Sequence, residues 1–216
     1  MDIVIIGAGG HGKVVLDILH LANQVNPVGF IDADPALAGT MICGLPVLGA
    51  INMLPKLRGQ KIKAAIVAIG DNRIRPSYAK MVQEAGLDLI NAIHPAAFVS
   101  PTATLGKNVV IAAGAVVSTE AKIADSVIIN TSATVDHECE IGPAAHICPG
   151  ARIAGRVRIG AGAFIGTGAI IIPCLSIGEH TMIAAGAVVI RDIPPYAVVM
   201  GVPAKVVKIR PPQPTD

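Results

Sequence analysis

The sequence predicts two domains of different fold class. Residues 1–95 are expected to form an α/β domain like half of a Rossmann fold. Residues 96–195 are expected to form an all-β parallel β-helix, followed by a C-terminal tail over 196–216. Three observations lead to this: an aliphatic repeat of period six, a glycine-rich loop between a strand and a helix, and a composition that is 52% hydrophobic but only 2% aromatic.

An aliphatic residue recurs at every sixth position in the second half of the chain. In most hexads the residue four places later is small or β-branched. We expect each hexad to form one short strand and one corner, so that three hexads close one coil and the aliphatic residues stack inside a triangular prism. Glycines should relieve corners where φ is positive. The aliphatic positions are Val99, Leu105, Ile111, Val117, Ile123, Ile129, Val135, Ile141, Ile147, Ile153, Ile159, Ile165, Ile171, Ile177, Ile183 and Val189.

A generic apolar β-sandwich does not explain this pattern. Sandwich strands alternate with period two and are joined by irregular loops, so they do not keep a period of six over sixteen positions. The pattern does not itself set the handedness of the helix.

The N-terminal half opens with a buried strand over 3–6 that runs into a glycine loop and a helix over 14–21. Gly7, Gly9 and Gly12 form a GxGxxG motif in the strand–loop–helix context that phosphate binding requires. A second strand, 28–31, ends at Asp32, where a dinucleotide fold places its ribose-binding acid. The literal interpretation is an NAD-binding domain.

Length argues against a complete dinucleotide fold. Further strands are expected over 65–69 and 87–93, with a helix between them that ends near Ala85, and the hexads follow directly. Half a fold suits one nucleotide, such as that of a nucleotide-sugar. His11 either touches the pyrophosphate or sugar or is a solvated loop residue, and Arg75 either pairs with phosphate or forms a surface salt bridge.

Composition excludes several classes. The formal net charge is +2 and there is no Trp, so nucleic acid is not an expected partner. No apolar run reaches the ~18 residues of a membrane span, and the N-terminus lacks the basic region of a signal peptide. We expect a cytoplasmic protein that does not insert into a membrane, with four reduced, buried thiols: Cys43, Cys139, Cys148 and Cys174.

The most acidic stretch of the repeat surrounds His137, which suits a general base near neutral pH. Asp136 and Glu138 flank it, and because a corner breaks strand alternation, either can orient the ring. One coil further lies Gly155, whose N–H is a natural oxyanion donor for a thioester carbonyl. His146 lies half a coil from His137, on a different face.

Short motifs are spread over nearly the whole chain: GGHGKVV at 9–15, FID at 30–32, AIGDNRIR at 68–75, NTS at 130–132, His137-Glu138 and GVPAK at 201–205. Through these motifs the chain resembles the bacterial nucleotide-sugar acetyltransferases of the hexapeptide-repeat family. These include the N-acetyltransferases that act on UDP- or GDP-linked 4-amino-4,6-dideoxy sugars and the related sialic-acid O-acetyltransferase-like proteins.

This resemblance implies a left-handed β-helix, a homotrimer and acetyl-CoA as co-substrate, without a metal. It implies His137 as base, Glu138 as its partner and Gly155 as oxyanion donor. It places an acetyl-CoA site at His146, Gly155, Thr167, Ala185 and Lys205. It places the nucleotide-sugar at Gly9, Gly10, His11, Gly12, Lys13, Asp32, Gly70, Arg75 and Asn130.

Some members carry a second acid after the equivalent of Asp32, where this chain has Ala33, so UDP and GDP both remain possible. The expected reaction is direct acetyl transfer to a sugar amine. O-acetylation of a sialic acid or related sugar is the nearest alternative. A non-catalytic nucleotide-sugar-binding scaffold is a third interpretation. A zinc lyase on the same scaffold would need three converging histidines, and the spacing of His137, His146 and His180 does not fit a shared column.

Overall fold

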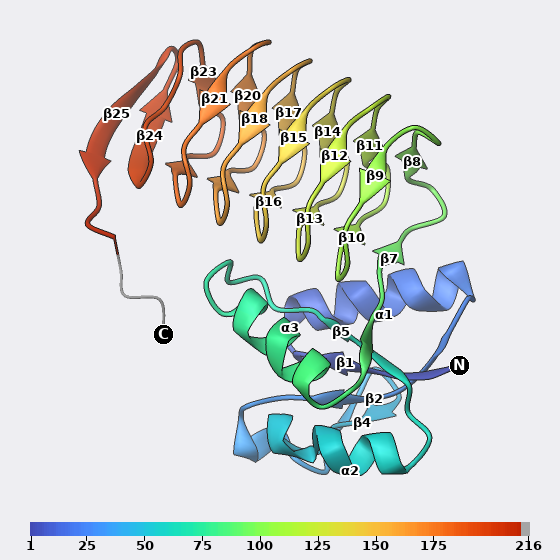
Figure 1. Ribbon diagram of the computed structural model, residues 1–216. Coiled ribbons are helices and arrows are strands. Elements are labelled where there is room, and N and C mark those ends of the chain that lie inside the picture. The colour runs from blue at the N-terminus through green and yellow to red at the C-terminus, as the bar shows by residue number, and fades with distance from the viewer. Residues whose placement is uncertain (213–216) are drawn as a thin grey trace. The chain divides into compact units, whose positions relative to one another are not determined.

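The computed structural model describes residues 1–212 (Figure 1). Residues 213–216, the last four of the expected tail, lie outside the described residues. The chain divides into two compact units, Met1–Pro95 and a second unit that begins at Ala96. Among residues 1–212, no helix is both long enough and apolar enough to cross a membrane.

A four-stranded parallel sheet with the order β2-β1-β5-β6 forms the centre of the first unit. Val4 and Ile6 of β1 share one core cluster with Leu54 and Val82, which come from helices α2 and α3. The expected half-Rossmann arrangement is confirmed. The strands are β1 (Asp2–Ile6), β2 (Asn26–Ile31), β5 (Ala64–Val67) and β6 (Asp88–Leu89), and the helices are α1 (Gly10–Ala22), α2 (Leu54–Gly59) and α3 (Arg75–Glu84).

Two parts of this unit differ from expectation. The strand expected over 87–93 is two short strands, β6 and β7 (Ala92–Ile93), because only Asp88 and Leu89 pair with β5 before the chain leaves the sheet. The segment after Asp32 contains short elements that the sequence did not predict, because the hydrophobic residues there show no periodicity. They are the 3-10 turns Pro35–Leu37 and Ile51–Met53, the hairpin of β3 (Met41–Ile42) and β4 (Leu45–Pro46), and α2.

The second unit is a left-handed parallel β-helix, as expected, and each aliphatic hexad residue ends a two-residue strand. Strands pair with the third strand along the chain, so Thr134 lies beside Arg152 at a spacing of one coil. The β16 face holds β10 (Val110–Ile111), β13 (Ile128–Ile129), β16 (His146–Ile147), β19 (Phe164–Ile165) and β22 (Met182–Ile183). The β14 face holds β8 (Phe98–Val99), β11 (Val116–Val117), β14 (Thr134–Val135), β17 (Arg152–Ile153), β20 (Ile170–Ile171) and β23 (Val188–Val189). The β15 face holds β9 (Thr104–Leu105), β12 (Lys122–Ile123), β15 (Glu140–Ile141), β18 (Arg158–Ile159) and β21 (Ser176–Ile177).

The expectation that glycines occupy the corners with positive φ is wrong for most corners. One residue per hexad has positive φ from Asn108 to Gly186, and most of these residues, such as Glu138 and Arg156, are not glycine. The corner N–H donates to a carbonyl of the preceding coil, as Arg156 does to His137 at 2.9 Å, and this bond holds the left-handed conformation. Glycine is needed instead where coils approach closely: a Cβ on Gly142 would lie 2.8 Å from the backbone nitrogen of Ala161.

The tail residues that the structure describes form a hairpin of β24 (Ala197–Gly201) and β25 (Ala204–Ile209), and β24 pairs in parallel with β22. The expectation of four buried thiols is wrong for two of them. Cys139 and Cys148 are buried, whereas Cys43 and Cys174 are exposed. Both exposed cysteines lie at positive φ in turns, where the side chain faces away from a core.

Candidate active site

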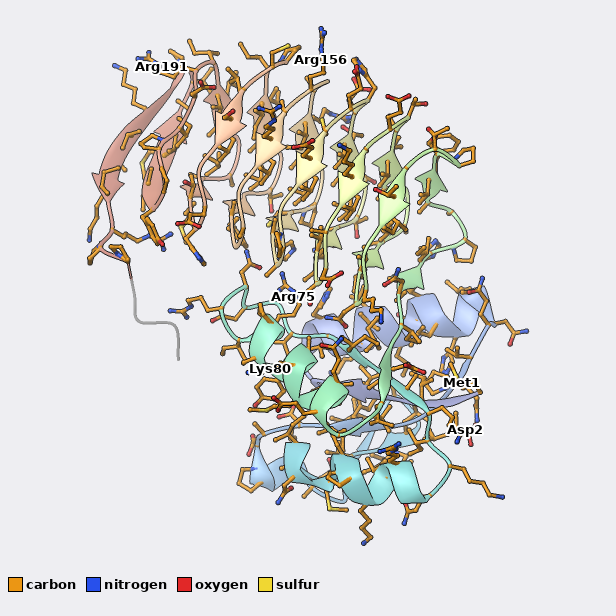
Figure 2. The ribbon with its side chains drawn as sticks, in the orientation of Figure 1. Met1, Asp2, Arg75, Lys80, Arg156 and Arg191 are labelled. Atoms are coloured by element: carbon orange, nitrogen blue, oxygen red, sulfur yellow. The ribbon has the colours of Figure 1, made fainter. Side chains whose placement is uncertain are left out.

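His137 lies at the corner between the β14 and β15 faces, directly after β14. Its side chain is roughly half exposed. The next coil presents Arg156 at the same corner, and Figure 2 labels it at the outer edge of the solenoid. The strict 18-residue coil therefore determines what lies next to the imidazole.

The two acids that flank His137 have different contacts. Glu138 Oε2 lies 2.9 Å from Nδ1 of the His137 ring, whereas Asp136 Oδ1 accepts the backbone N–H of His137 at 2.7 Å. Glu138 has φ of 57°, and this left-handed corner turns its carboxylate toward the ring of its neighbour. The structure thus places Glu138 on the imidazole and Asp136 on the backbone, which the sequence left open.

Gly155 lies directly under the imidazole. A Cβ built on Gly155 would meet His137 Nε2, so only glycine allows the ring to rest there. Within residues 1–212 no protein acceptor takes the N–H of Gly155. The placement is the one that coil spacing predicts, while the catalytic roles of His137, Glu138 and Gly155 stay predictions.

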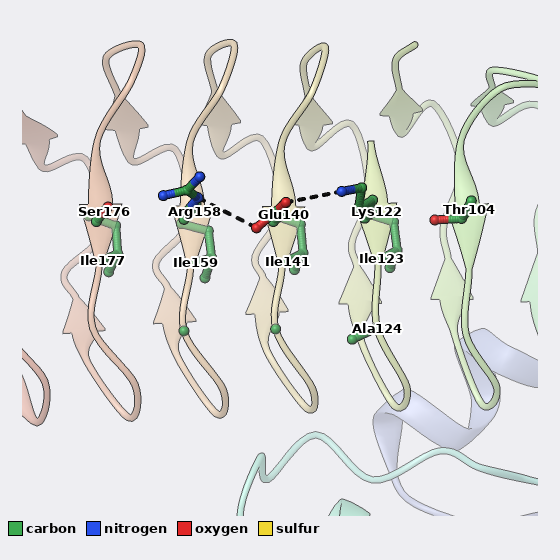
Figure 3. A pocket seen from close by; sticks show the side chains of 12 residues that line it. Thr104, Lys122, Ile123, Ala124, Glu140, Ile141, Arg158, Ile159, Ser176 and Ile177 are labelled. Atoms are coloured by element: carbon green, nitrogen blue, oxygen red, sulfur yellow. Dashed lines mark hydrogen bonds and ion pairs between the residues drawn. The ribbon is translucent and has the colours of Figure 1, made fainter. Parts of the chain in front are cut away.

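A hollow of about 360 Å³ on the β14 face adjoins this pair. Asp136 and Ala154, which directly precede His137 and Gly155, both line it. A larger hollow of about 690 Å³ lies on the β15 face along the exposed ion pairs Lys122–Glu140 and Glu140–Arg158 (Figure 3). Neither hollow is lined by a predicted site residue, but only the smaller one is lined by the residues that directly precede His137 and Gly155. We therefore favour the smaller hollow, which adjoins an imidazole and a carboxylate that can move a proton.

Apart from Gly155, the expected acetyl-CoA residues lie elsewhere in the second unit. Thr167 and Ala185 are stacked one coil apart at the corner between the β16 and β14 faces, because the N–H of Gly186 donates to Thr167 O at 2.9 Å. His146 lies on the β16 face and Lys205 in β25. The His137 corner and the Thr167 corner are therefore opposite edges of the β14 face, and one chain does not bring them together.

Asn130 lies beside His146. Its Nδ2 is 3.1 Å from His146 Nε2, and its Oδ1 accepts the N–H of Thr131 at 2.8 Å. The His146 ring also packs edge-on against Phe164, with centroids 5.4 Å apart. Asn130 and His146 are 16 residues apart, about one coil, so the repeat carries a signal for this contact that the motifs do not.

The glycine loop of the first unit has the geometry expected of a phosphate site. Gly9 is the N-cap of α1, and Gly9 and Gly10 are exposed with open space around the Cα atoms. Gly12 is buried, and a Cβ there would clash with the carbonyl of Gly7. Backbone N–H groups of the first helical turn are thus accessible to an anion, and Lys13 is exposed on the same turn.

Asp32 braces this loop. Its Oδ2 accepts the N–H of Ala8 at 2.7 Å and its Oδ1 accepts the N–H of Asp34 at 2.9 Å. The carboxylate is partly buried and accepts these two bonds in addition to any bond from a ribose. A role in ribose binding stays a prediction.

Arg75 is fully buried, so the surface salt bridge considered for it is wrong. Its guanidinium donates to Ile69 O at 2.9 Å and to Asn72 Oδ1 at 3.0 Å. Burial lowers the pKa of Arg75 to about 10, which leaves it charged at neutral pH. Arg75 therefore holds the loop that carries Gly70, which is exposed, and phosphate pairing stays a prediction.

His11 should make stability depend on pH. Burial, with a smaller contribution from the charge of Arg75, lowers the pKa of His11 to about 4, below its usual 6.5. Between these pH values the unfolded chain binds the proton and the folded chain does not, so this stabilisation is present above about pH 6.5 and is lost toward pH 4. We expect wild-type protein to lose up to about 2 kcal/mol more than His11→Gln between pH 7 and pH 5. Urea denaturation measures this, with the exposed His20→Gln in the same helix as control, and equal losses in all three proteins would contradict it.

No group of three His, Cys, Asp or Glu residues in the described part of the chain is placed to hold a metal ion. The three histidines that a zinc lyase would need do not meet. His137 contacts Glu138, His146 contacts Asn130, and His180 stacks on Tyr196 with centroids 5.3 Å apart.

Comparison with known proteins supports this arrangement. The PglD N-terminal domain family matches residues 2–82, and the bacterial transferase hexapeptide family matches residues 156–191. A curated relative is the UDP-N-acetylbacillosamine N-acetyltransferase of Bacillus subtilis, 32% identical over 113 residues, which are 52% of this chain and 51% of that protein. The chain spans about half the length, or less, of the curated relatives it matches.

Solved structures match over nearly the whole chain. PerB from Caulobacter crescentus, in complex with CoA and GDP-perosamine, is 44% identical, with a TM-score of 0.91 over 96% of this chain and 98% of that chain. The acetyltransferase domain of PglB from Neisseria gonorrhoeae, with acetyl coenzyme A, is 38% identical, with a TM-score of 0.89 over 95% and 98%. The chain therefore belongs to the nucleotide-sugar N-acetyltransferases of the hexapeptide-repeat family.

Proposed function

We propose that this protein transfers the acetyl group of acetyl-CoA to the amino group of a nucleotide-linked 4-amino-4,6-dideoxy sugar. The observation that carries the proposal is the His137 imidazole held between the Glu138 carboxylate and Gly155. The likeness to a perosamine N-acetyltransferase, solved with CoA and GDP-perosamine, supports both substrate classes. Two structures of that relative carry a histidine replaced by asparagine or by alanine.

The contact with the Glu138 carboxylate determines which nitrogen of the His137 ring carries the hydrogen. An ionised carboxylate only accepts hydrogen bonds, so Nδ1 carries the hydrogen and Nε2 keeps its lone pair. Nε2 is the atom that lies over Gly155. It is therefore free to take a proton at the point where the reacting groups meet.

The reaction is a direct attack within a ternary complex. The sugar nitrogen forms a bond to the thioester carbonyl carbon, and Nε2 of His137 takes the proton that the nitrogen loses. The Gly155 N–H donates to the oxyanion of the tetrahedral intermediate. The carbon–sulfur bond then breaks, the sulfur of coenzyme A takes up the proton, and the amide remains on the sugar. Glu138 stabilises the imidazolium that exists between these steps.

A homotrimer supplies the rest of the site. The β14 face has exposed apolar side chains, with Phe98 58% and Ile170 41% exposed, and this suits a partner solenoid. Its two edges carry His137 and Gly155 on one side and Thr167 and Ala185 on the other. Packing of neighbouring copies along this face brings the acetyl-CoA residues of one subunit to the base of the next. His146 and Lys205 are further acetyl-CoA contacts in this assembly.

The glycine loop, from Gly9 to Lys13, binds the nucleotide phosphates at the N-terminus of α1. Asp32 and Gly70 border that site, and the buried Arg75 acts on it by holding the loop that carries Gly70. Asn130 is a further predicted contact of the nucleotide-sugar. A cytoplasmic location follows from acetyl-CoA and a nucleotide-sugar as substrates, since both are cytoplasmic metabolites, and from four free thiols.

A substrate panel tests the proposal. Free thiol is followed while acetyl-CoA is mixed with UDP- and GDP-linked 4-amino-4,6-dideoxy sugars and with sialic acid. We expect turnover of at least one amino sugar and none of sialic acid. Turnover of sialic acid alone would replace the proposal with O-acetylation, and binding of nucleotide-sugars without any turnover would replace it with a scaffold role.

A further inference from the structure

The Cys139 thiol forms a hydrogen bond next to the proposed active site. Cys139 Sγ donates to the carbonyl of Ala154 at 3.1 Å. Cys139 is fully buried in the inward slot that alanine fills in most hexads. Its acceptor belongs to the peptide that leads into Gly155.

The geometry of that peptide links the thiol to the oxyanion donor. In a trans peptide the carbonyl of Ala154 and the N–H of Gly155 point in opposite directions. Because a thiol inside the prism holds the carbonyl inward, the Gly155 N–H is directed outward. The hollow on the β14 face that Ala154 lines lies on that side.

The repeat shows that this N–H is not needed by the solenoid. The hexad position of Gly155 is occupied by proline in four other hexads, Pro101, Pro143, Pro149 and Pro173, and proline has no N–H. Within residues 1–212 the Gly155 N–H also has no protein acceptor. It is therefore available to a substrate.

The repeat also shows what the thiol replaces. In corners with alanine in the inward slot, the alanine N–H closes the turn onto the equivalent carbonyl, as Ala151 does to Cys148 O at 3.1 Å and Ala145 to Gly142 O at 3.2 Å. At the Gly155 corner this slot holds Val157, and in the described residues its N–H makes no such bond to Ala154. Among the described residues, Val127 and Leu175 in the same slot also make no such bond, so its absence goes with the larger side chain. At the Gly155 corner the thiol of the preceding coil gives the carbonyl a donor.

We propose that Cys139 is a positioning residue for acetyl transfer, which holds the Ala154–Gly155 peptide so that the Gly155 N–H faces the thioester oxygen. This rests on the proposed function. Burial raises the pKa of Cys139, which keeps the thiol protonated and able to donate. Consecutive residues then carry the base, its partner and the donor that aligns the oxyanion site: His137, Glu138 and Cys139.

Steady-state kinetics test the proposal with Cys139→Ala, Cys139→Ser and the control Val127→Ala. We expect Cys139→Ala to lower kcat about tenfold with the KM of both substrates nearly unchanged, because the interaction acts in the transition state. Cys139→Ser, which keeps a donor, should recover most of kcat. Val127→Ala shortens another buried residue in an inward slot and should lower thermal stability without this loss of kcat. An unchanged kcat in Cys139→Ala, or a serine variant no better than alanine, overturns the proposal.

Crystal structures of wild type and Cys139→Ala separate this proposal from the proposed function. If the wild type turns over no amino sugar, the proposed function fails, and the orientation of the Ala154–Gly155 peptide still decides the role of Cys139. We expect that peptide to rotate, or its carbonyl to take an ordered water, when the thiol is lost. The same orientation with no new donor on Ala154 O overturns the positioning role.

Discussion

Replacement of His137 by alanine is expected to lower kcat for acetyl transfer by about 10²–10⁴-fold, the usual cost of losing a general base. The KM for acetyl-CoA and for the amino sugar should change little, because the imidazole acts on a proton that moves only in the reaction. Raising the pH should partly restore the rate, since more of the sugar amine is then unprotonated and hydroxide can take the proton that the nitrogen loses in the reaction. Thiol release across a pH series measures all three effects.

Two further variants make this prediction specific. Glu138→Gln keeps the size of the side chain but removes the charge that fixes the Nδ1 hydrogen, so a smaller loss of kcat is expected than for His137→Ala. His20→Ala removes an exposed histidine of α1 and should retain wild-type kinetics. A His137→Ala variant with more than a tenth of the wild-type kcat would remove His137 from the mechanism.

Gly155→Ala is expected to reduce kcat by about 10²-fold or more, the usual cost of losing an oxyanion donor or misplacing a base. The added methyl group would overlap Nε2 of His137, so the imidazole has to rotate away from the corner. Because the overlap is with a side chain that can move, the solenoid should still fold. Kinetics combined with thermal denaturation separate loss of activity from loss of fold.

Gly142→Ala is the matched control for crowding. Its added methyl would lie 2.8 Å from the backbone of Ala161 in the next coil, and His137 is not among its neighbours. We expect a lower melting temperature from Gly142→Ala with kcat retained in the folded fraction, the reverse of Gly155→Ala. If the two variants lose kcat in parallel with melting temperature, Gly155 contributes only to packing.

The repeat allowed much of the candidate site to be predicted. In a solenoid with no insertions, spacing in the sequence sets distance in space, so a separation of 18 residues is enough to predict that Gly155 lies next to His137. The same rule separated His146 from His137. In the first unit, three strands of the sheet and the glycine loop were predicted, since apolar runs and Gly12 are strong signals, while the fourth strand was predicted too long. No element was predicted between Asp32 and Ala64, where no periodicity exists.

Other features depended on tertiary contacts. Arg75 follows a strand in a polar segment, which suggested the surface, yet carbonyls and Asn72 supply the acceptors that allow it to be buried. Glu138, and not Asp136, reaches the imidazole because Glu138 itself has a positive φ at the corner. A positive φ is not expected from the sequence at a residue that is not glycine.

The sequence by itself determined the two fold classes, the coil length and the pairing of His137 with Gly155, because a strict period leaves one way to stack an aliphatic core. Only the tertiary structure decided which acid holds the base, that Asp32 braces the glycine loop, and that the Cys139 thiol binds the Ala154 carbonyl. Those contacts depend on side-chain direction at corners and loops, where local backbone angles and neighbouring coils set the geometry and periodicity does not.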